Sequence, residues 1–301
     1  MQRSIEHSIY DWVKEIQQVI LFTRPELAKI FQTYAGEAIF ARKLLDINLR
    51  SIPSNSKVLE VGAGSLILSC QLSKEGYEVT ALEPISQGFS HFNELQIVVL
   101  DLARRGGFCP EILELHAEQL DKEKIYDFAF SINVMEHVDN VSQVIYRVAD
   151  ALKPDAVYRF ICPNYSFPYE PHFNIPIIFS KKVTEAVFKN KIFTNSEISD
   201  PIGTWRSINW ISVRLVRDIA LRNNIEVFFN KSLLSKMLER VVSDPIFRAR
   251  RPSWLKLIFE LVIKLKLHQL TQYIPVGLQP TIDCSIFSTS RMQKCRKLRR
   301  G

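Results

Sequence analysis

The chain has 301 residues, of which 47% are hydrophobic and 24% charged, an ordinary composition for one large globular domain or two small ones. Its net charge of +7 comes mostly from six basic residues within 291–301, so the remainder is close to neutral. Five scattered cysteines without a CxxC pair argue against a disulfide framework and indicate a reducing cytoplasm. The N-terminus carries charges where a signal peptide needs an apolar run, so we expect no export.

Residues 5–50 have helical periodicity, with apolar side chains three and four positions apart. We therefore predict an N-terminal helical cap over 1–50, followed by one domain over 51–290 and a basic C-terminal tail over 291–301. Prolines and aromatic residues crowd the stretch 163–207, which predicts an ordered loop inserted into the domain. Helical spacing returns at 208–222, and a second, largely helical insert is predicted at 231–275.

Seven short runs of β-branched and aromatic residues alternate with segments of helical length after residue 56. Strands separated by helices call for right-handed crossovers and a parallel sheet covered on both faces. We predict an α/β fold, a doubly wound, mostly parallel seven-stranded Rossmann-like sheet with helices on both faces. The predicted strands are KVLEV at 57–61, YEVTAL at 77–82, EILEL at 111–115, YDFAFSI at 126–132, VYRFIC at 157–162, IEVFF at 225–229 and PTIDCSIFSTS at 280–290.

A glycine-containing turn follows the first predicted strand. Gly62 and Gly64 allow the backbone to turn sharply and to approach a ligand closely, which a Cβ atom would obstruct. Glu83 ends the next strand, at the spacing of an acid that binds ribose hydroxyls. A dinucleotide site would require a third glycine where Ile67 stands, and the acidic Glu60 favours a ligand with a cationic amino acid end instead of phosphates.

These motifs resemble the class I S-adenosylmethionine-dependent methyltransferases, and in particular the small-molecule group that includes the ubiquinone-biosynthesis O-methyltransferases. The resemblance covers roughly residues 57–164. The family motif E-x-G-x-G-x-G is kept except at its last glycine, where this chain has Leu66. The resemblance implies that S-adenosylmethionine is the cofactor, and that it is bound by Glu60, Gly62, Ala63, Gly64, Glu83, Ala117, Glu118 and Asn133.

Two histidines are candidates for the base that a hydroxyl acceptor requires. His137 follows the fourth strand, and His172 lies in the aromatic loop. The sequence does not choose between them. An aromatic wall with a few polar groups suits an organic acceptor, so Tyr165, Tyr169 and Glu170 are candidate substrate contacts. We predict no metal site, because neither His116 nor His137 has a partner at metal-ligand spacing.

We interpret the chain as an enzyme that moves a methyl group to an oxygen, or a nitrogen, of a small or lipid-linked organic acceptor. A nearly all-apolar helix at 254–268 and the basic tail suggest contact with a membrane surface, although burial against the domain or in a homodimer also explains the helix. Two alternatives stay open. The tail would suit a nucleic-acid methyltransferase, and Leu66 would suit an inactive, membrane-associated scaffold that binds the cofactor.

Overall fold

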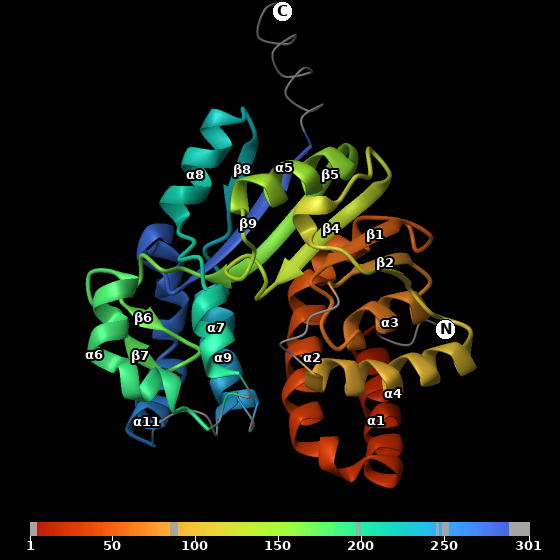
Figure 1. The fold of residues 1–301 in the computed structure, drawn as a ribbon, viewed down its shortest axis with the longest axis horizontal. Coiled ribbons are helices and arrows are strands. Elements are labelled where there is room, and N and C mark those ends of the chain that lie inside the picture. The colour runs from red at the N-terminus through yellow and green to blue at the C-terminus, as the bar shows by residue number, and fades with distance from the viewer. Residues whose placement is uncertain are drawn as a thin grey trace, which may run out of the picture. The chain divides into compact units, whose positions relative to one another are not determined.

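The computed structural model describes residues 5–84, 90–196, 198, 200–244, 247–248 and 253–288. Within them, seven strands form one sheet in the order β3-β2-β1-β4-β5-β9-β8, and helices lie around it (Figure 1). The strands are β1 (Lys57–Val61), β2 (Glu78–Leu82), β3 (Glu111–Leu113), β4 (Tyr126–Ile132), β5 (Leu152–Pro163), β8 (Glu226–Phe229) and β9 (Thr281–Phe287). β1 pairs in parallel with β2 and β4, and β2 with β3, whereas β9 is antiparallel to both of its neighbours. The predicted mostly parallel α/β sheet is thereby confirmed.

The chain divides into two compact units, and residues 1–116 with 125–130 form the first. This unit holds β1, β2, β3, most of β4 and the N-terminal helices. The buried side chains Ile9, Trp12 and Ile16 follow helical spacing, and Trp12 Nε1 donates to the Ile67 carbonyl at 3.1 Å. Its helical elements are α1 (Ile5–Thr23), η1 (Pro25–Leu27), α2 (Ala28–Arg50), α3 (Ile67–Lys74) and α4 (Ser90–Gly106).

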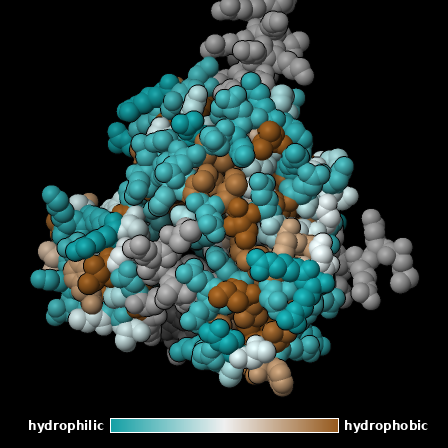
Figure 2. Space-filling model, turned by 45° about the vertical axis from the view of Figure 1, so that its right-hand side comes forward, coloured by the Kyte–Doolittle hydropathy of each residue, from teal (hydrophilic) through white to brown (hydrophobic). Residues whose placement is uncertain are grey.

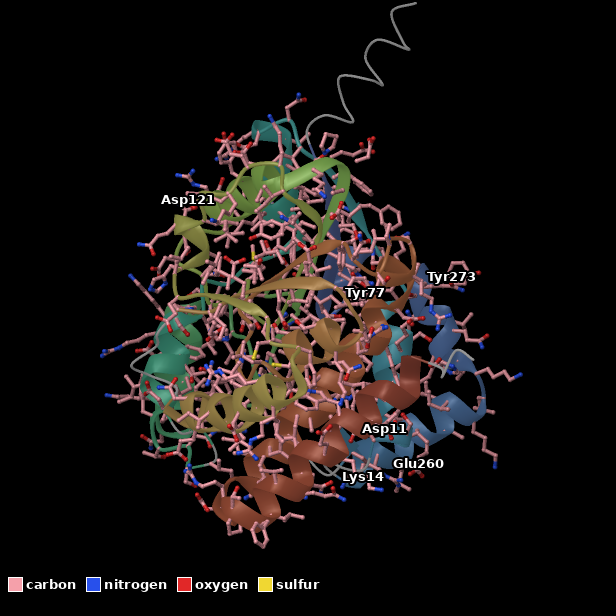
Figure 3. The ribbon with its side chains drawn as sticks, turned by 90° about the vertical axis from the view of Figure 1, so that its right-hand side faces the viewer. Asp11, Lys14, Tyr77, Asp121, Glu260 and Tyr273 are labelled. Carbon is pink, nitrogen blue, oxygen red and sulfur yellow. The ribbon has the colours of Figure 1, made fainter. Side chains whose placement is uncertain are left out.

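The polar side of α1 faces away from that apolar stripe. Asp11 and Lys14, both exposed, lie on this side of the helix, and Figure 3 shows them on the red helix. Tyr77, labelled in the same view, donates its hydroxyl to the Leu49 carbonyl at 2.9 Å and so joins the start of β2 to the end of α2. The N-terminal helices are therefore packed into the first unit and are not a detached arm.

The second unit comprises residues 117–124 and 131–301. It contains the carboxyl end of β4, the strands β5, β8 and β9, and a two-stranded hairpin of β6 (Tyr169–Glu170) and β7 (Ile175–Pro176). Its helices include α6 (Lys181–Phe193) and α9 (Leu233–Ser243), and α9 packs against α11 (Ser253–Lys264) and η3 (Leu267–Tyr273). The other helical elements are η2 (Ala117–Gln119), α5 (Val141–Ala151), α7 (Pro201–Ser207), α8 (Val213–Arg222) and η4 (Val276–Leu278).

The stretch 163–207 is more regular than the ordered loop that we expected, because it contains the β6–β7 hairpin, α6 and α7. Both helices begin at side-chain caps: Ser180 Oγ accepts from Val183 N, and Asp200 Oδ1 accepts from Gly203 N. The expected helix over 208–222 is shorter than predicted, since 208–212 is irregular, with φ 60° at Trp210, and α8 begins after the Ser212 cap. The predicted basic tail at 291–301 lies outside the described residues.

The face of the molecule drawn in Figure 2 is mostly hydrophilic. Figure 2 shows one face on which hydrophobic side chains gather in a few patches among hydrophilic ones. Within the described residues, no helix combines the length and the apolar character that crossing a bilayer requires.

Candidate active site

The glycine turn joins β1 to α3 in the first unit. Gly62 and Gly64 have φ values of 73° and 49°, in the left-handed region that glycine tolerates best. Gly62 N donates to the Leu82 carbonyl at 2.7 Å, which fixes the turn against the end of β2. Leu66 also has a left-handed conformation, with φ 62°, at the position where the family motif has its last glycine. The backbone therefore keeps the shape of a three-glycine turn although the third glycine is missing.

Two buried acids flank this turn. Glu83 Oε2 accepts from Gly64 N at 2.9 Å, and burial raises the pKa of Glu83 despite that hydrogen bond. Glu60 accepts from Ser69 Oγ, and burial raises the pKa of Glu60 to about 8. Both predicted acids thus lie in the first unit, and both are desolvated before any ligand binds. Such an arrangement favours a ligand that brings positive charge or hydroxyl donors.

Two side chains that the sequence did not single out complete the turn. Gln96 Nε2, from α4, donates to the Gly64 carbonyl at 2.6 Å, and Ser69 supplies the donor to Glu60. Ala63 is buried, and its carbonyl accepts from Leu66 N at 2.9 Å. Neither Gln96 nor Ser69 has a motif of its own, so only the folded backbone reveals their roles.

The remaining predicted cofactor residues lie in the second unit. Ala117 and Glu118 form η2, and Glu118 Oε1 accepts from Asn140 N at 3.1 Å. Gln143 Nε2 donates to the Glu118 carbonyl at 3.0 Å, so η2 is held against the start of α5. Asn133 turns the chain after β4 with φ 57°, a conformation that asparagine tolerates. Its role as a cofactor contact stays a prediction, as do those of Ala117 and Glu118.

A short turn after β4 carries Glu136 and His137. Asn209 holds this turn by donating from Nδ2 to the carbonyls of Met135 and Val138, at 2.8 and 2.7 Å, and from its backbone N to the Glu136 carbonyl at 2.8 Å. The hydroxyl of Ser207 donates to the Thr204 carbonyl and receives the hydrogen bond from His137 Nδ1, at 2.8 Å. Burial lowers the pKa of His137 to about 3, so the imidazole is neutral at pH 7.

His172 lies edge-on to His137, with 5.1 Å between the ring centroids. The buried Glu170 carboxylate accepts from His172 Nδ1 at 2.6 Å, from the Tyr165 hydroxyl at 3.2 Å and from Phe173 N at 2.7 Å. Burial lowers the pKa of His172, but the hydrogen bond to Glu170 and the charges of Glu170 and Glu136 together outweigh burial, and the net shift is upward. The same hydrogen bond lowers the pKa of Glu170, against its burial.

The structure thus brings together four of the five residues predicted for catalysis and acceptor binding. Tyr169 is the exception: it alternates with Glu170 on β6, is partly exposed, and donates its hydroxyl to Asn174 Oδ1 at 2.5 Å. Trp210 was not predicted, and its ring stacks on Tyr165 with centroids 5.5 Å apart. The buried Glu136 was also missed, because an acid beside a histidine in sequence gives no sign of burial.

Known proteins show the same type of domain. Residues 31–174 match the methyltransferase-domain family. Two uncharacterized proteins of Mycobacterium tuberculosis are each 45% identical over 260 residues, 86% of this chain and 88% of the relative. A ubiquinone biosynthesis O-methyltransferase of Rickettsia conorii is 28% identical over 104 residues, 35% of this chain and 34% of that protein. A solved structure of Haemonchus contortus phosphoethanolamine N-methyltransferase 2 with S-adenosyl-L-methionine is 17% identical, with a TM-score of 0.46, over 82% of this chain and 51% of that one.

In this protein the first strand of a mostly parallel sheet runs into a glycine turn, and an acid follows the second strand. This is the arrangement of Rossmann-like domains that bind nucleotide cofactors. Residues 31–174 form a methyltransferase domain, and the protein is an S-adenosylmethionine-dependent methyltransferase. The predicted enzyme class and cofactor are confirmed.

Proposed function

We propose that this enzyme transfers the methyl group of S-adenosylmethionine to an oxygen of a small or lipid-linked organic acceptor. The observation that carries the proposal is the histidine pair of His137 and His172, whose Nδ1 atoms are both engaged by neighbouring oxygens. Each ring then presents Nε2, the atom that can assist in removing a proton from a hydroxyl. Amine acceptors that are already neutral need no such group.

The reaction is an in-line displacement at carbon. The acceptor oxygen forms a bond to the methyl carbon while the carbon–sulfur bond breaks, and the sulfur keeps the electron pair and becomes a neutral thioether. The hydroxyl proton leaves at the histidine pair. The stacked rings of Tyr165 and Trp210 offer a flat apolar surface beside that pair, which suits an aromatic acceptor such as a phenol.

The cofactor half of the proposal assigns Glu83 to the ribose hydroxyls and Glu60 to the amino acid end of S-adenosylmethionine. Calorimetry tests it: Glu83→Ala should weaken cofactor binding about 10- to 100-fold, because hydrogen bonds to a charged group contribute roughly 1.5–3 kcal/mol. Equal binding to both proteins would contradict the assignment of Glu83 to the ribose, and no binding to the wild type would contradict the cofactor half of the proposal as a whole.

The acceptor half is tested by formation of S-adenosylhomocysteine with catechol, and separately with a primary amine. We expect transfer to the phenol, and loss of proton removal in His172→Gln should lower kcat about 10²- to 10⁴-fold without weakening cofactor binding. Tyr146→Phe, on the exposed side of α5, is the matched control and should keep wild-type turnover. Transfer to the amine alone would refute an oxygen acceptor.

We also propose that the enzyme approaches a lipid-linked acceptor through a surface formed by α11 and η3, the lipid-facing surface. Leu257, Ile258 and Leu261 are exposed on α11, and Lys264 follows them one turn later. Tyr273, at the end of η3, is exposed as well and projects from the edge of the molecule in Figure 3. Apolar side chains flanked by lysine suit an anionic membrane interface.

A further inference from the structure

Three side chains of the second unit converge on one point beside the candidate acceptor residues. One carboxylate oxygen of Glu136 and one ring nitrogen each of His137 and His172 all lie within 4.8 Å of one another. We call these three residues the EHH cluster. His172 is 35 positions from His137 in the chain, so only the fold brings them together.

Glu136 is the unusual member. Its side chain is fully buried, and within the described residues neither carboxylate oxygen has a hydrogen-bond partner. A buried carboxylate normally has a cation or several donors, because removing a charge from water is costly. The buried Glu170, the last residue of β6, shows the ordinary case with donors from Tyr165, His172 and Phe173. Glu136 therefore has no hydrogen-bond donor among these residues, and the charge of a protonated His172 offsets only part of its burial.

The outer contacts of the two histidines fix which nitrogen carries the proton. Glu170 is an acceptor for several donors, so His172 Nδ1 is its donor, and Nε2 keeps its lone pair when the ring is neutral. Ser207 gives its own proton to the Thr204 carbonyl, so His137 Nδ1 must donate to it and Nε2 again keeps its lone pair. Metal-binding histidines are commonly oriented in this way, by a hydrogen bond from the ring nitrogen that does not bind the metal to a neighbouring oxygen.

We propose that the EHH cluster binds one divalent first-row transition-metal ion, of the zinc type, and that this ion holds the acceptor oxygen. Two imidazoles and one carboxylate suit zinc better than magnesium or calcium, which prefer oxygen ligands throughout. Three protein ligands leave a position open, as in catalytic zinc sites. Ligands about 2.0 Å from a tetrahedral ion are about 3.3 Å apart, so a movement of about 1 Å closes the cluster around it.

The inference rests on the proposed methyl transfer to oxygen, but it replaces proton removal by the histidine pair with metal binding by that pair. Bound to the ion, an acceptor hydroxyl has a lowered pKa and releases its proton to solvent. The oxygen then attacks the methyl carbon, and the sulfur leaves with the electron pair. His137 and His172 act as ligands of the ion, and Glu170 and Ser207 are positioning residues that hold the rings.

Metal binding is measured on the full chain without any acceptor. After chelator treatment and dialysis, the wild type should bind one equivalent of Zn²⁺ by elemental analysis, and Co²⁺ should give visible absorption bands of a low-symmetry site. Glu136→Gln should lose both signals. Glu170→Gln should weaken binding about 10- to 100-fold, the usual effect of removing an outer-shell partner. Glu226→Gln, an exposed acid on β8, is the matched control and should bind as the wild type does.

Thermal unfolding keeps the test decisive if a variant folds poorly. Without metal, Glu136→Gln removes a charge that has no partner, so its melting temperature should equal or exceed that of the wild type; Zn²⁺ should raise the melting temperature of the wild type only. Wild-type protein that binds no metal, or Glu136→Gln that binds it equally, overturns the inference. Methyl transfer that persists after metal removal also overturns the inference, but it leaves the proposed function intact. The proposed function itself fails if the wild type with its metal bound does not bind the cofactor or does not transfer the methyl group.

Discussion

Replacing Leu66 tests how far a left-handed backbone conformation governs the cofactor turn. Leu66 has φ 62° and ψ 6° and is 1% exposed. Its backbone therefore occupies the position of a glycine while its side chain belongs to the core. The left-handed conformation costs a leucine roughly 1–2 kcal/mol, and removing a buried leucine side chain costs about 2–5 kcal/mol. The second term is larger, so both Leu66→Ala and Leu66→Gly should destabilise the protein.

The order of the two variants is the informative result. Both lose the leucine side chain beyond Cβ, but only glycine also relieves the backbone. Against the relief of roughly 1–2 kcal/mol stands the larger unfolded-state entropy of glycine, about 0.5–1 kcal/mol. Leu66→Gly should therefore be more stable than Leu66→Ala by about 0.5–1 kcal/mol.

Urea unfolding followed by circular dichroism measures this difference, and Leu72 is the control. Leu72 is fully buried like Leu66 but lies inside α3, with ordinary helical geometry. There the order should reverse, and Leu72→Gly should be less stable than Leu72→Ala by about 1 kcal/mol. If glycine were the worse replacement at position 66 as well, the reasoning from backbone strain would be wrong.

Two further predictions concern charge and the lipid-facing surface. Because burial raises the pKa of Glu60 from 4.5 to about 8, its contribution to stability is fully present below pH 4.5 and is lost as the pH rises through 8. Glu60→Gln should therefore gain stability relative to the wild type by up to about 1.4 kcal/mol per pH unit over that range, and parallel pH profiles in urea unfolding would contradict this. Leu257, 68% exposed, and Leu261, 57% exposed, should anchor the enzyme to vesicles with anionic lipid. The double variant Leu257→Glu with Leu261→Glu should then stop floating with those vesicles, whereas Leu221→Glu on α8 should float as the wild type does.

The strands could be predicted well because a strand that is buried on both faces consists of a short run of apolar residues. The predicted spans 57–61 and 126–132 agree residue for residue with β1 and β4. The helix α6 was missed although Ser180 is an ordinary cap, because the neighbouring prolines and aromatic residues favoured a loop. Leu66 shows the opposite case: the motif alone located a glycine-like position, and the backbone there is indeed left-handed.

The EHH cluster could not be predicted, for a reason that is geometric. A metal site can be recognised in a sequence when its ligands lie three or four residues apart on one element. His172, however, belongs to a hairpin region 35 positions beyond His137. The burial of Glu136 depends on Asn209, which holds the turn from still farther along the chain. Contacts of this kind are set by the tertiary fold, so an acid and a histidine side by side carry no signal in the sequence.

Buried acids separate into two kinds in this protein, and the separation indicates where ligands bind. Asp283 accepts two hydrogen bonds from the Arg159 guanidinium, at 2.8 and 2.7 Å, and is thereby neutralised within the fold. Glu60 and Glu136 are equally buried, yet neither has a cationic side chain as a hydrogen-bond or ion-pair partner within the described residues. Folding gives these two acids no such partner, so burial raises their pKa values, and we expect a positively charged ligand to stabilise the ionised form of each on binding. Glu60 lies beside the glycine turn and Glu136 beside two histidine lone pairs, so the first suits the amino group of the cofactor and the second a metal ion.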